Sequence, residues 1–250
     1  MTTQAGVPQV PDPDPDPAAA PASLRPLVDG ALGLDPAWFG WRRLQPDNGE
    51  PRRASVLMLF TDGESGGPDV LLTERAATLR SHAGQVAFPG GRLDPTDTGP
   101  VHAALREARE ETGLDPSGVV PLALLPDLFI PPTGFLVTPV LAHWASPSPV
   151  RVVDTAEVAR VVRVPVAVLT DPANRFTVRG PSGHTGPAFD AAGLMVWGFT
   201  AGLLSALLQR SGWERPWDAG RVLDLDDAWA RARRNEPEGV RVDDHGVVDR

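Results

Sequence analysis

The chain has 250 residues, a formal net charge of −9 at pH 7 and no cysteine. This length fits one well-cored domain with appendages, and the absence of cysteine excludes a disulfide, a thiolate nucleophile and a cysteine–zinc site. All 23 basic residues are arginines, which also excludes a Schiff-base lysine and a lysine-bearing P-loop. The acidic balance disfavours nucleic-acid binding, although a polyanionic substrate stays compatible with it because metal ions invert the local field.

The first 21 residues are rich in proline, aspartate and alanine, including an alternating run over residues 11–17. Such a composition cannot bury enough apolar surface to order itself, so residues 1–21 are predicted to form a disordered, semi-extended tail. An interaction arm is the alternative. Residues 22–53 are predicted to be helical and irregular, with a short helix over 24–34. Because neither a basic n-region nor an apolar h-region opens the sequence, we expect a cytoplasmic location.

Two strands are predicted next, over residues 55–60 and 70–73. The residues between them, Gly63 to Gly67, match the G-x-S-x-G pattern of a hydrolase nucleophile elbow. That elbow requires a helix directly after the serine, whereas Pro68 and a second strand follow here. The pattern therefore favours a hairpin loop.

A helix is predicted between Pro100, which suits a first helical turn, and Gly113, which suits the position after a helix end. Its apolar residues recur at i, i+3, i+4 and i+7. These residues are Val101, Ala104, Leu105 and Ala108. Glu107, Glu110 and Glu111 share the opposite arc, where like charges destabilise a helix by roughly 0.2–0.5 kcal/mol per pair. A hard cation such as Mg²⁺ would offset that repulsion, while a solvated charged face is the alternative.

Further strands are predicted over residues 119–130, 135–144 and 157–164, followed by a hairpin over 176–186. Residues 191–209 carry no charge and contain Gly198-x-x-x-Gly202, so a membrane span is an alternative to a buried helix. Small and polar residues dilute this stretch, which favours the buried helix. The five histidines show no zinc-site spacing.

A family resemblance emerges from Gly91 through Leu114. This stretch resembles the Nudix box, G-x5-E-x7-R-E-U-x-E-E-x-G-U, in which U is a bulky apolar residue. Asp97 stands where glutamate is usual, one extra residue precedes Arg106, and Ala108 is small for its U position. Upstream, residues 71–76, Arg80, Gly84 and the Phe-Pro-Gly-Gly run 88–91 resemble the signature of the coenzyme A pyrophosphatase branch, which carries the same extension.

The resemblance implies an α/β/α sandwich with a mixed sheet and the box as loop-helix-loop, over a domain of residues 54–212. Residues 213–250 would form an extension with a flexible end. It also implies Mg²⁺ or Mn²⁺ as cofactor and hydrolysis of the diphosphate bond of coenzyme A or its acyl or oxidised forms. The strand over 157–164 resembles one that enters the second main helix of many Nudix domains.

The resemblance also assigns roles to individual residues. Glu107 and Glu111 are the expected metal ligands, and Glu110 is the next ligand or the base. Arg106 is expected to pair with a glutamate of the box, and Glu157 is a further acidic candidate. The expected substrate-binding residues are Arg75, Arg80, Gln85, Gly90 and Gly91.

Two alternative functions stay open from the sequence. One is a Nudix hydrolase of another nucleoside diphosphate, such as ADP-ribose or NADH. The other is a non-catalytic binding module of the same fold. A homodimer is also left open, and neither a nucleic-acid nor a membrane partner is expected.

Overall fold

The computed structural model describes residues 12–35, 51–63, 67–79, 82–131, 133–191 and 193–234. The strands of its larger sheet are β1 Arg52–Phe60, β2 Asp69–Arg75, β3 Val86–Ala87, β4 Gly90–Arg92, β5 Val119–Leu124, β6 Leu128–Ile130, β7 Phe135–Trp144 and β8 Val158–Pro165. They follow the path β3-β2-β1-β7-β5, with β4 on β1, β6 on β7 and β8 on β2. Strands β1 and β7 run parallel while β1 and β2 run antiparallel, so the sheet is mixed, as the resemblance implies.

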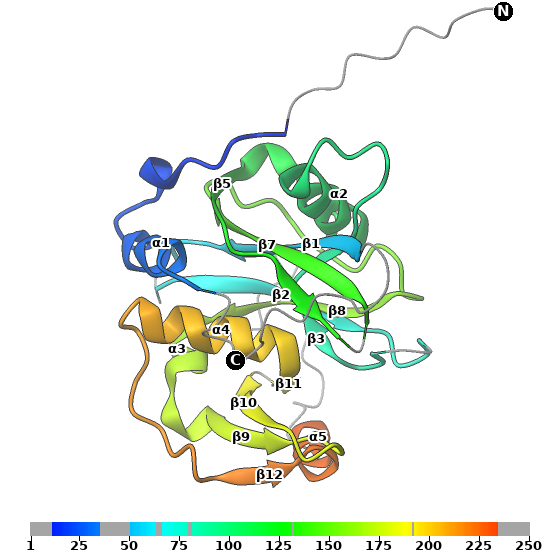
Figure 1. Ribbon diagram of the computed structural model, residues 1–250, viewed down its shortest axis with the longest axis vertical. Helices are drawn as coiled ribbons and strands as arrows, with labels where there is room; N and C mark the ends of the chain where they lie inside the picture. The colour runs from blue at the N-terminus through cyan, green and yellow to red at the C-terminus, as the bar shows by residue number, and fades with distance from the viewer. Residues whose placement is uncertain are drawn as a thin grey trace, which may run out of the picture.

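Helices cover both faces of this sheet. Alternate residues of β1 point to opposite faces, as the pleat of a strand requires. Leu57 and Leu59 pack under α2 (Pro100–Thr112), whereas Met58 and Phe60 pack with α1 (Arg25–Leu32) and α4 (Gly198–Arg210). Figure 1 shows α2 on one side of the sheet and α4 on the other. The predicted α/β/α sandwich is confirmed.

Helix α2 has the ends and the apolar face that the sequence predicts. Pro100 occupies its first turn, and Gly113 follows it with a φ of 70°, the left-handed conformation that glycine adopts without steric cost. Val101, Ala104 and Ala108 are fully buried against the sheet, and Leu105 is partly buried. Burial of this face holds the acidic end of the helix at a fixed place over β4.

A second sheet packs on the far side of α4, and only its first hairpin was predicted from the sequence. Its elements are β9 Arg175–Arg179, β10 Thr185–Ala191, β11 Leu194–Val196, β12 Val222–Asp224 and the flanking helix α5 Leu225–Arg234. The strand order is β11-β10-β9-β12. The antiparallel pairing of β9 with β10 confirms the hairpin. Strand β12, which lies in the predicted C-terminal extension, pairs with β9 across residue 212, and the boundary expected there stays a prediction.

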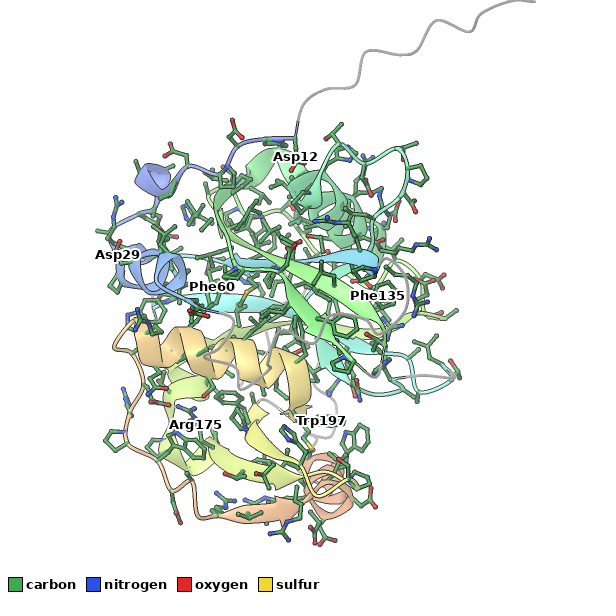
Figure 2. The ribbon with its side chains drawn as sticks, in the orientation of Figure 1. Asp12, Asp29, Phe60, Phe135, Arg175 and Trp197 are labelled. Carbon is green, nitrogen blue, oxygen red and sulfur yellow. The ribbon has the colours of Figure 1, made fainter. Side chains whose placement is uncertain are left out.

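Arg175 links the second sheet to α4 through hydrogen bonds and ring contacts. Its side chain is fully buried and donates to Glu214 Oε1 (2.7 Å) and to Ser205 Oγ (2.8 Å) on α4. Its guanidinium also lies over the rings of Phe189 and Trp217. Figure 2 labels it between α4 and the second sheet. Instead of a main helix, only the short α3 (Val166–Thr170) follows β8, and α4 begins after the second sheet's β11.

The N-terminal segment also differs from its prediction. Residues 17–19 form a short 3₁₀ turn, Asp16 N donates to Pro121 O at 3.0 Å, and Ala20 is buried. The expected disordered tail over residues 1–21 is therefore corrected for residues 12–21, because their backbone and side chains find partners on the core. The predicted short helix is confirmed as α1.

Helix α4 corresponds to the buried helix expected within residues 191–209. Within the part of the chain that the structure describes, no helix is both long and apolar enough to cross a membrane. The uncharged run at 191–209 instead divides into the end of β10, strand β11 and α4. The G-x-S-x-G pattern lies between the antiparallel strands β1 and β2, as a hairpin loop does, although its residues 64–66 are outside the described residues.

Candidate active site

Strand β4 contains two glycines, Gly90 and Gly91, which approach neighbouring groups more closely than a residue with a side chain could. It pairs with β1, where Gly90 lies opposite Val56 and Gly91 opposite Ser55. A Cβ atom on Gly90 would lie 2.7 Å from Val56 Cα, and one on Gly91 would lie 2.6 Å from Glu107 Oε2. Glycine at 90 thus lets β4 join the sheet, and glycine at 91 leaves room for the Glu107 carboxylate.

Glu107 and Glu111 lie on the face of α2 that meets β4. The Gly90 N–H donates to Glu111 Oε2 at 3.2 Å, and Glu111 is only 8% exposed. Burial raises the pKa of Glu111 to about 7, with the Glu107 charge adding to the rise and the Gly90 hydrogen bond opposing it. Burial also raises the pKa of Glu107, although Arg106 partly offsets this. The structure therefore holds two crowded carboxylates whose negative charge is poorly compensated.

Arg106 is the centre of the polar network beside these carboxylates. It donates to Asp97 through Nε (3.0 Å) and Nη2 (2.9 Å), to Glu107 Oε1 at 3.1 Å and to Glu110 Oε2 at 2.9 Å. The Asp97 side chain is fully buried. Burial alone raises the pKa of Asp97, but hydrogen bonds from Arg106, the Asp94 N–H and His102 outweigh it and lower the pKa to about 2. Asp97 is thus an ionised anchor for Arg106.

Glu110 differs from its two neighbours. Its side chain is 59% exposed and is held by Arg106. The acidic arc predicted from the sequence thus divides into a buried pair facing β4 and one carboxylate facing solvent. Glu110 is free to contact a water molecule or a substrate at the rim of the site.

The predicted substrate-binding residues lie next to this arc. Arg75 ends β2 and bonds through its backbone to Gln85, and its charge lowers the pKa of Glu111. The exposed Glu157 also acts on Glu111, raising its pKa. Arg75 and Glu157 therefore lie near enough to act on Glu111, whereas the side-chain oxygen of Gln85 lies 2.7 Å from His82 Nδ1. Arg80 lies outside the described residues.

The carboxylates fit a divalent cation that shares its ligands with a substrate. Within the described ranges, no three His, Cys, Asp or Glu side chains form a ready-made metal cage. Mg²⁺ needs none, because it keeps several waters and typically binds one or two carboxylates together with substrate phosphates. Glu107 and Glu111 meet that requirement, and a cation beside them would compensate the charge that burial leaves unfavourable.

Sequence reasoning missed the side chains that support Arg106. Asp97 is noted in the sequence only as a departure from the usual glutamate, yet it makes the bidentate contact with Arg106. His102 Nδ1 lies 2.8 Å from Asp97 Oδ1 and adds a second contact to it. The signal available in the sequence is the i, i+5 spacing of Asp97 and His102 around the helix start.

A family model described as the NUDIX domain matches residues 51–179, which is more than half of the chain. The chain belongs to the Nudix hydrolase family. It is 36% identical over 190 residues to a protein of Shigella flexneri serotype 5b (strain 8401) named uncharacterized Nudix hydrolase NudL, over 73% of this chain and 96% of that relative. A relative of the same name from Cronobacter sakazakii (strain ATCC BAA-894) is 40% identical over 168 residues, covering 66% and 85% of the two chains.

Solved Nudix structures are also similar. The Nudix hydrolase RenU from M. Smegmatis has a TM-score of 0.44 and 22% identity, over 67% of this chain and 90% of its own. As a Nudix hydrolase, this chain acts on diphosphate bonds of small molecules, and enzymes of this family generally use divalent metal ions.

Proposed function

We propose that this Nudix hydrolase cleaves the diphosphate bond of coenzyme A or its acyl or oxidised derivatives, with Mg²⁺ or Mn²⁺ as cofactor. The products would be 3′,5′-ADP and 4′-phosphopantetheine or its acyl form. Support comes from the upstream residues 71–76 and 88–91, which resemble the coenzyme A pyrophosphatase signature, and from the close approach of Gly90 to Glu111 and of Gly91 to Glu107.

The choice of coenzyme A rests on the resemblance, while the observation that carries the diphosphate part of this proposal is the environment of the Arg75 side chain. Its charge acts on Glu111, yet its Nε is buried and has no hydrogen-bond partner among the described residues. An unsatisfied buried donor of this kind is costly, and a phosphate oxygen would satisfy it. Arg75 therefore suits a substrate phosphate placed beside Glu107 and Glu111.

Each residue of the site has a role in this chemistry. A bound divalent ion neutralises phosphoryl oxygens and lowers the pKa of a bound water. Glu107 and Glu111 would hold that ion, and Gly90 and Gly91 give it access to the backbone. Arg106, fixed by Asp97, holds the Glu107 rotamer. Arg75 and Gln85 would orient the substrate, with Arg80 as a further phosphate contact.

Two carboxylates are candidates for the base that takes the proton of the attacking water. Glu110 is exposed and already held by Arg106, while Glu157 is exposed and acts electrostatically on Glu111. Glu110→Gln and Glu157→Gln separate them, because loss of a general base costs roughly 10²–10⁴-fold in kcat. The larger loss identifies the base.

Mass-spectrometric product analysis tests the proposal. The enzyme is incubated separately with coenzyme A, ADP-ribose and NADH in Mg²⁺ or Mn²⁺. The expected result is 3′,5′-ADP and 4′-phosphopantetheine from coenzyme A at the highest kcat/KM of the panel. If coenzyme A is the poorest substrate, the upstream residues have been misassigned, and ligand binding without any product would support a non-catalytic module.

A matched pair of variants ties the products to the site. Glu111→Gln should abolish turnover while circular dichroism stays like that of the wild type. Arg109→Gln, an exposed change on the same helix, should leave turnover unchanged. A cytoplasmic location and a homodimeric state stay predictions.

A further inference from the structure

The N-terminus of α2 is capped by a residue from far away in the sequence. Its N-cap is Gly99, which has no side chain, and Pro100 has no N–H. The next two amides, Val101 N and His102 N, donate to Asp12 Oδ2 (3.2 Å) and Oδ1 (2.7 Å). Asp12 therefore performs the capping role that Ser, Thr, Asp or Asn usually performs from the N-cap position itself. Figure 2 labels Asp12 beside this end of α2.

Gly99 makes room for the Asp12 side chain. A Cβ atom on Gly99 would lie 2.9 Å from Asp12 Cβ and closer still to its carboxyl group. The backbone of Gly99 is extended, with a φ of 177° and a ψ of −171°, a region that other residues also adopt. The need for glycine at 99 therefore comes from the approach of Asp12 rather than from backbone strain.

Hydrogen bonds connect this cap with the acidic end of the helix. The backbone N–H of His102 donates to Asp12, and the imidazole ring of His102 makes a hydrogen bond with Asp97. Asp97 anchors Arg106 through two hydrogen bonds. Arg106 in turn binds Glu107 and Glu110. A change at Asp12 thus reaches the carboxylates through groups in direct contact.

We propose that Asp12 is a positioning residue for the reaction of this enzyme. By holding the N-terminal segment on the first turn of α2, it fixes His102 and Asp97 and so the Arg106 contact that orients Glu107 and Glu110. The role in catalysis rests on the proposed metal-dependent hydrolysis. The cap itself does not depend on which substrate is used.

Three variants of the full chain test this role. Asp12→Ala removes both acceptors, whereas Asp12→Asn keeps one side-chain oxygen, which can accept the shorter of the two bonds, from His102 N. The matched control is Asp16→Ala, which removes a cap in the same segment, where Asp16 Oδ1 accepts from Ala18 N, outside the chain of hydrogen bonds that joins Asp12 to Arg106. For each variant, the Mn²⁺ dissociation constant is measured by isothermal titration, together with kcat, KM and Tm.

We expect Asp12→Ala to raise the Mn²⁺ dissociation constant about fivefold and to lower kcat similarly, somewhat less than direct loss of an outer-shell partner. Asp12→Asn should restore both values to within about twofold. Asp16→Ala should lower Tm without changing Mn²⁺ affinity. If Asp12→Ala changes only Tm, as the control does, Asp12 has a merely structural role and the proposal is overturned.

A double-mutant cycle gives an independent test. Gly99→Ala should weaken Mn²⁺ binding as Asp12→Ala does, because the new methyl group displaces the Asp12 carboxylate. In the Asp12→Gly background, which removes the Asp12 Cβ as well as its carboxylate, the same change should have no further effect. Additive effects of the two substitutions would contradict the proposed route. Failure of coenzyme A as a substrate would count against the proposed function alone, because Mn²⁺ affinity is measured without substrate.

Discussion

Gly91→Ala should separate activity from stability in this enzyme. The added Cβ would lie 2.6 Å from Glu107 Oε2, whereas ordinary van der Waals contact begins at 3.4 Å. Its Cδ and Oε1 atoms would lie closer still, so the carboxyl group must withdraw by about 1 Å, and a displacement of that size in an active site can cost 10²-fold in rate. That factor corresponds to about 2.7 kcal/mol of transition-state stabilisation.

The fold should tolerate the same substitution. The colliding atoms are the far end of a flexible side chain, so Glu107 can move while the backbone stays in place. We expect kcat to fall about 100-fold and the free energy of unfolding to change by less than about 1 kcal/mol. Steady-state kinetics with Mg²⁺ and urea denaturation measure the two quantities.

Gly90→Ala is the matched control, because its Cβ would meet the backbone of β1, 2.7 Å from Val56 Cα. That variant should lose stability by several kcal/mol, since neither strand can withdraw without breaking the pairing. A Gly91→Ala enzyme with a wild-type kcat would refute the reasoning. So would a Gly91→Ala enzyme that is as unstable as Gly90→Ala.

Three further predictions follow from the site. Folding raises the pKa of Glu111 from 4.5 to about 7, so between these pH values the folded state binds a proton that the unfolded state has released. The metal-free enzyme should therefore lose about 3 kcal/mol of stability as the pH rises from 4.5 to about 7. Glu111→Gln should remove this dependence in urea denaturation with a chelator, and an unchanged slope would contradict the assignment. Arg106→Gln should destabilise by roughly 3–5 kcal/mol, because it leaves the buried Asp97 without its countercharge, whereas exposed Arg109→Gln should stay within about 0.5 kcal/mol. Gly113→Ala should cost about 1 kcal/mol, a fall of roughly 2–4 °C in Tm, with kcat unchanged; a lower kcat would mean that the helix end moves.

Features set by neighbouring residues could be predicted from the sequence. Pro100, Gly113 and the apolar face between them determine α2 through local geometry and a single helical period. The resemblance to the Nudix box also placed Gly90 and Gly91 beside the glutamates, although 21 residues separate Gly90 from Glu111. The grouping of Glu107 and Glu111 at β4 follows from these two facts.

Features set by distant contacts could not be predicted in the same way. The second sheet depends on the pairing of β9 with β12, which no local pattern reveals. Asp12 was assigned to a disordered tail because the segment around it is rich in proline, aspartate and alanine, yet it meets α2 through a gap that Gly99 leaves. The different environments of Glu110 and Glu111 likewise depend on how α2 is rotated against β4.

Mn²⁺ titration of the substrate-free enzyme tests the central claim most directly. The claim is that Glu107 and Glu111, held against Gly90 and Gly91, bind the divalent ion needed for hydrolysis. Isothermal titration should show Mn²⁺ binding to the wild type and a loss of affinity of at least about tenfold in Glu107→Gln and in Glu111→Gln. Wild-type affinity in both variants would contradict the account.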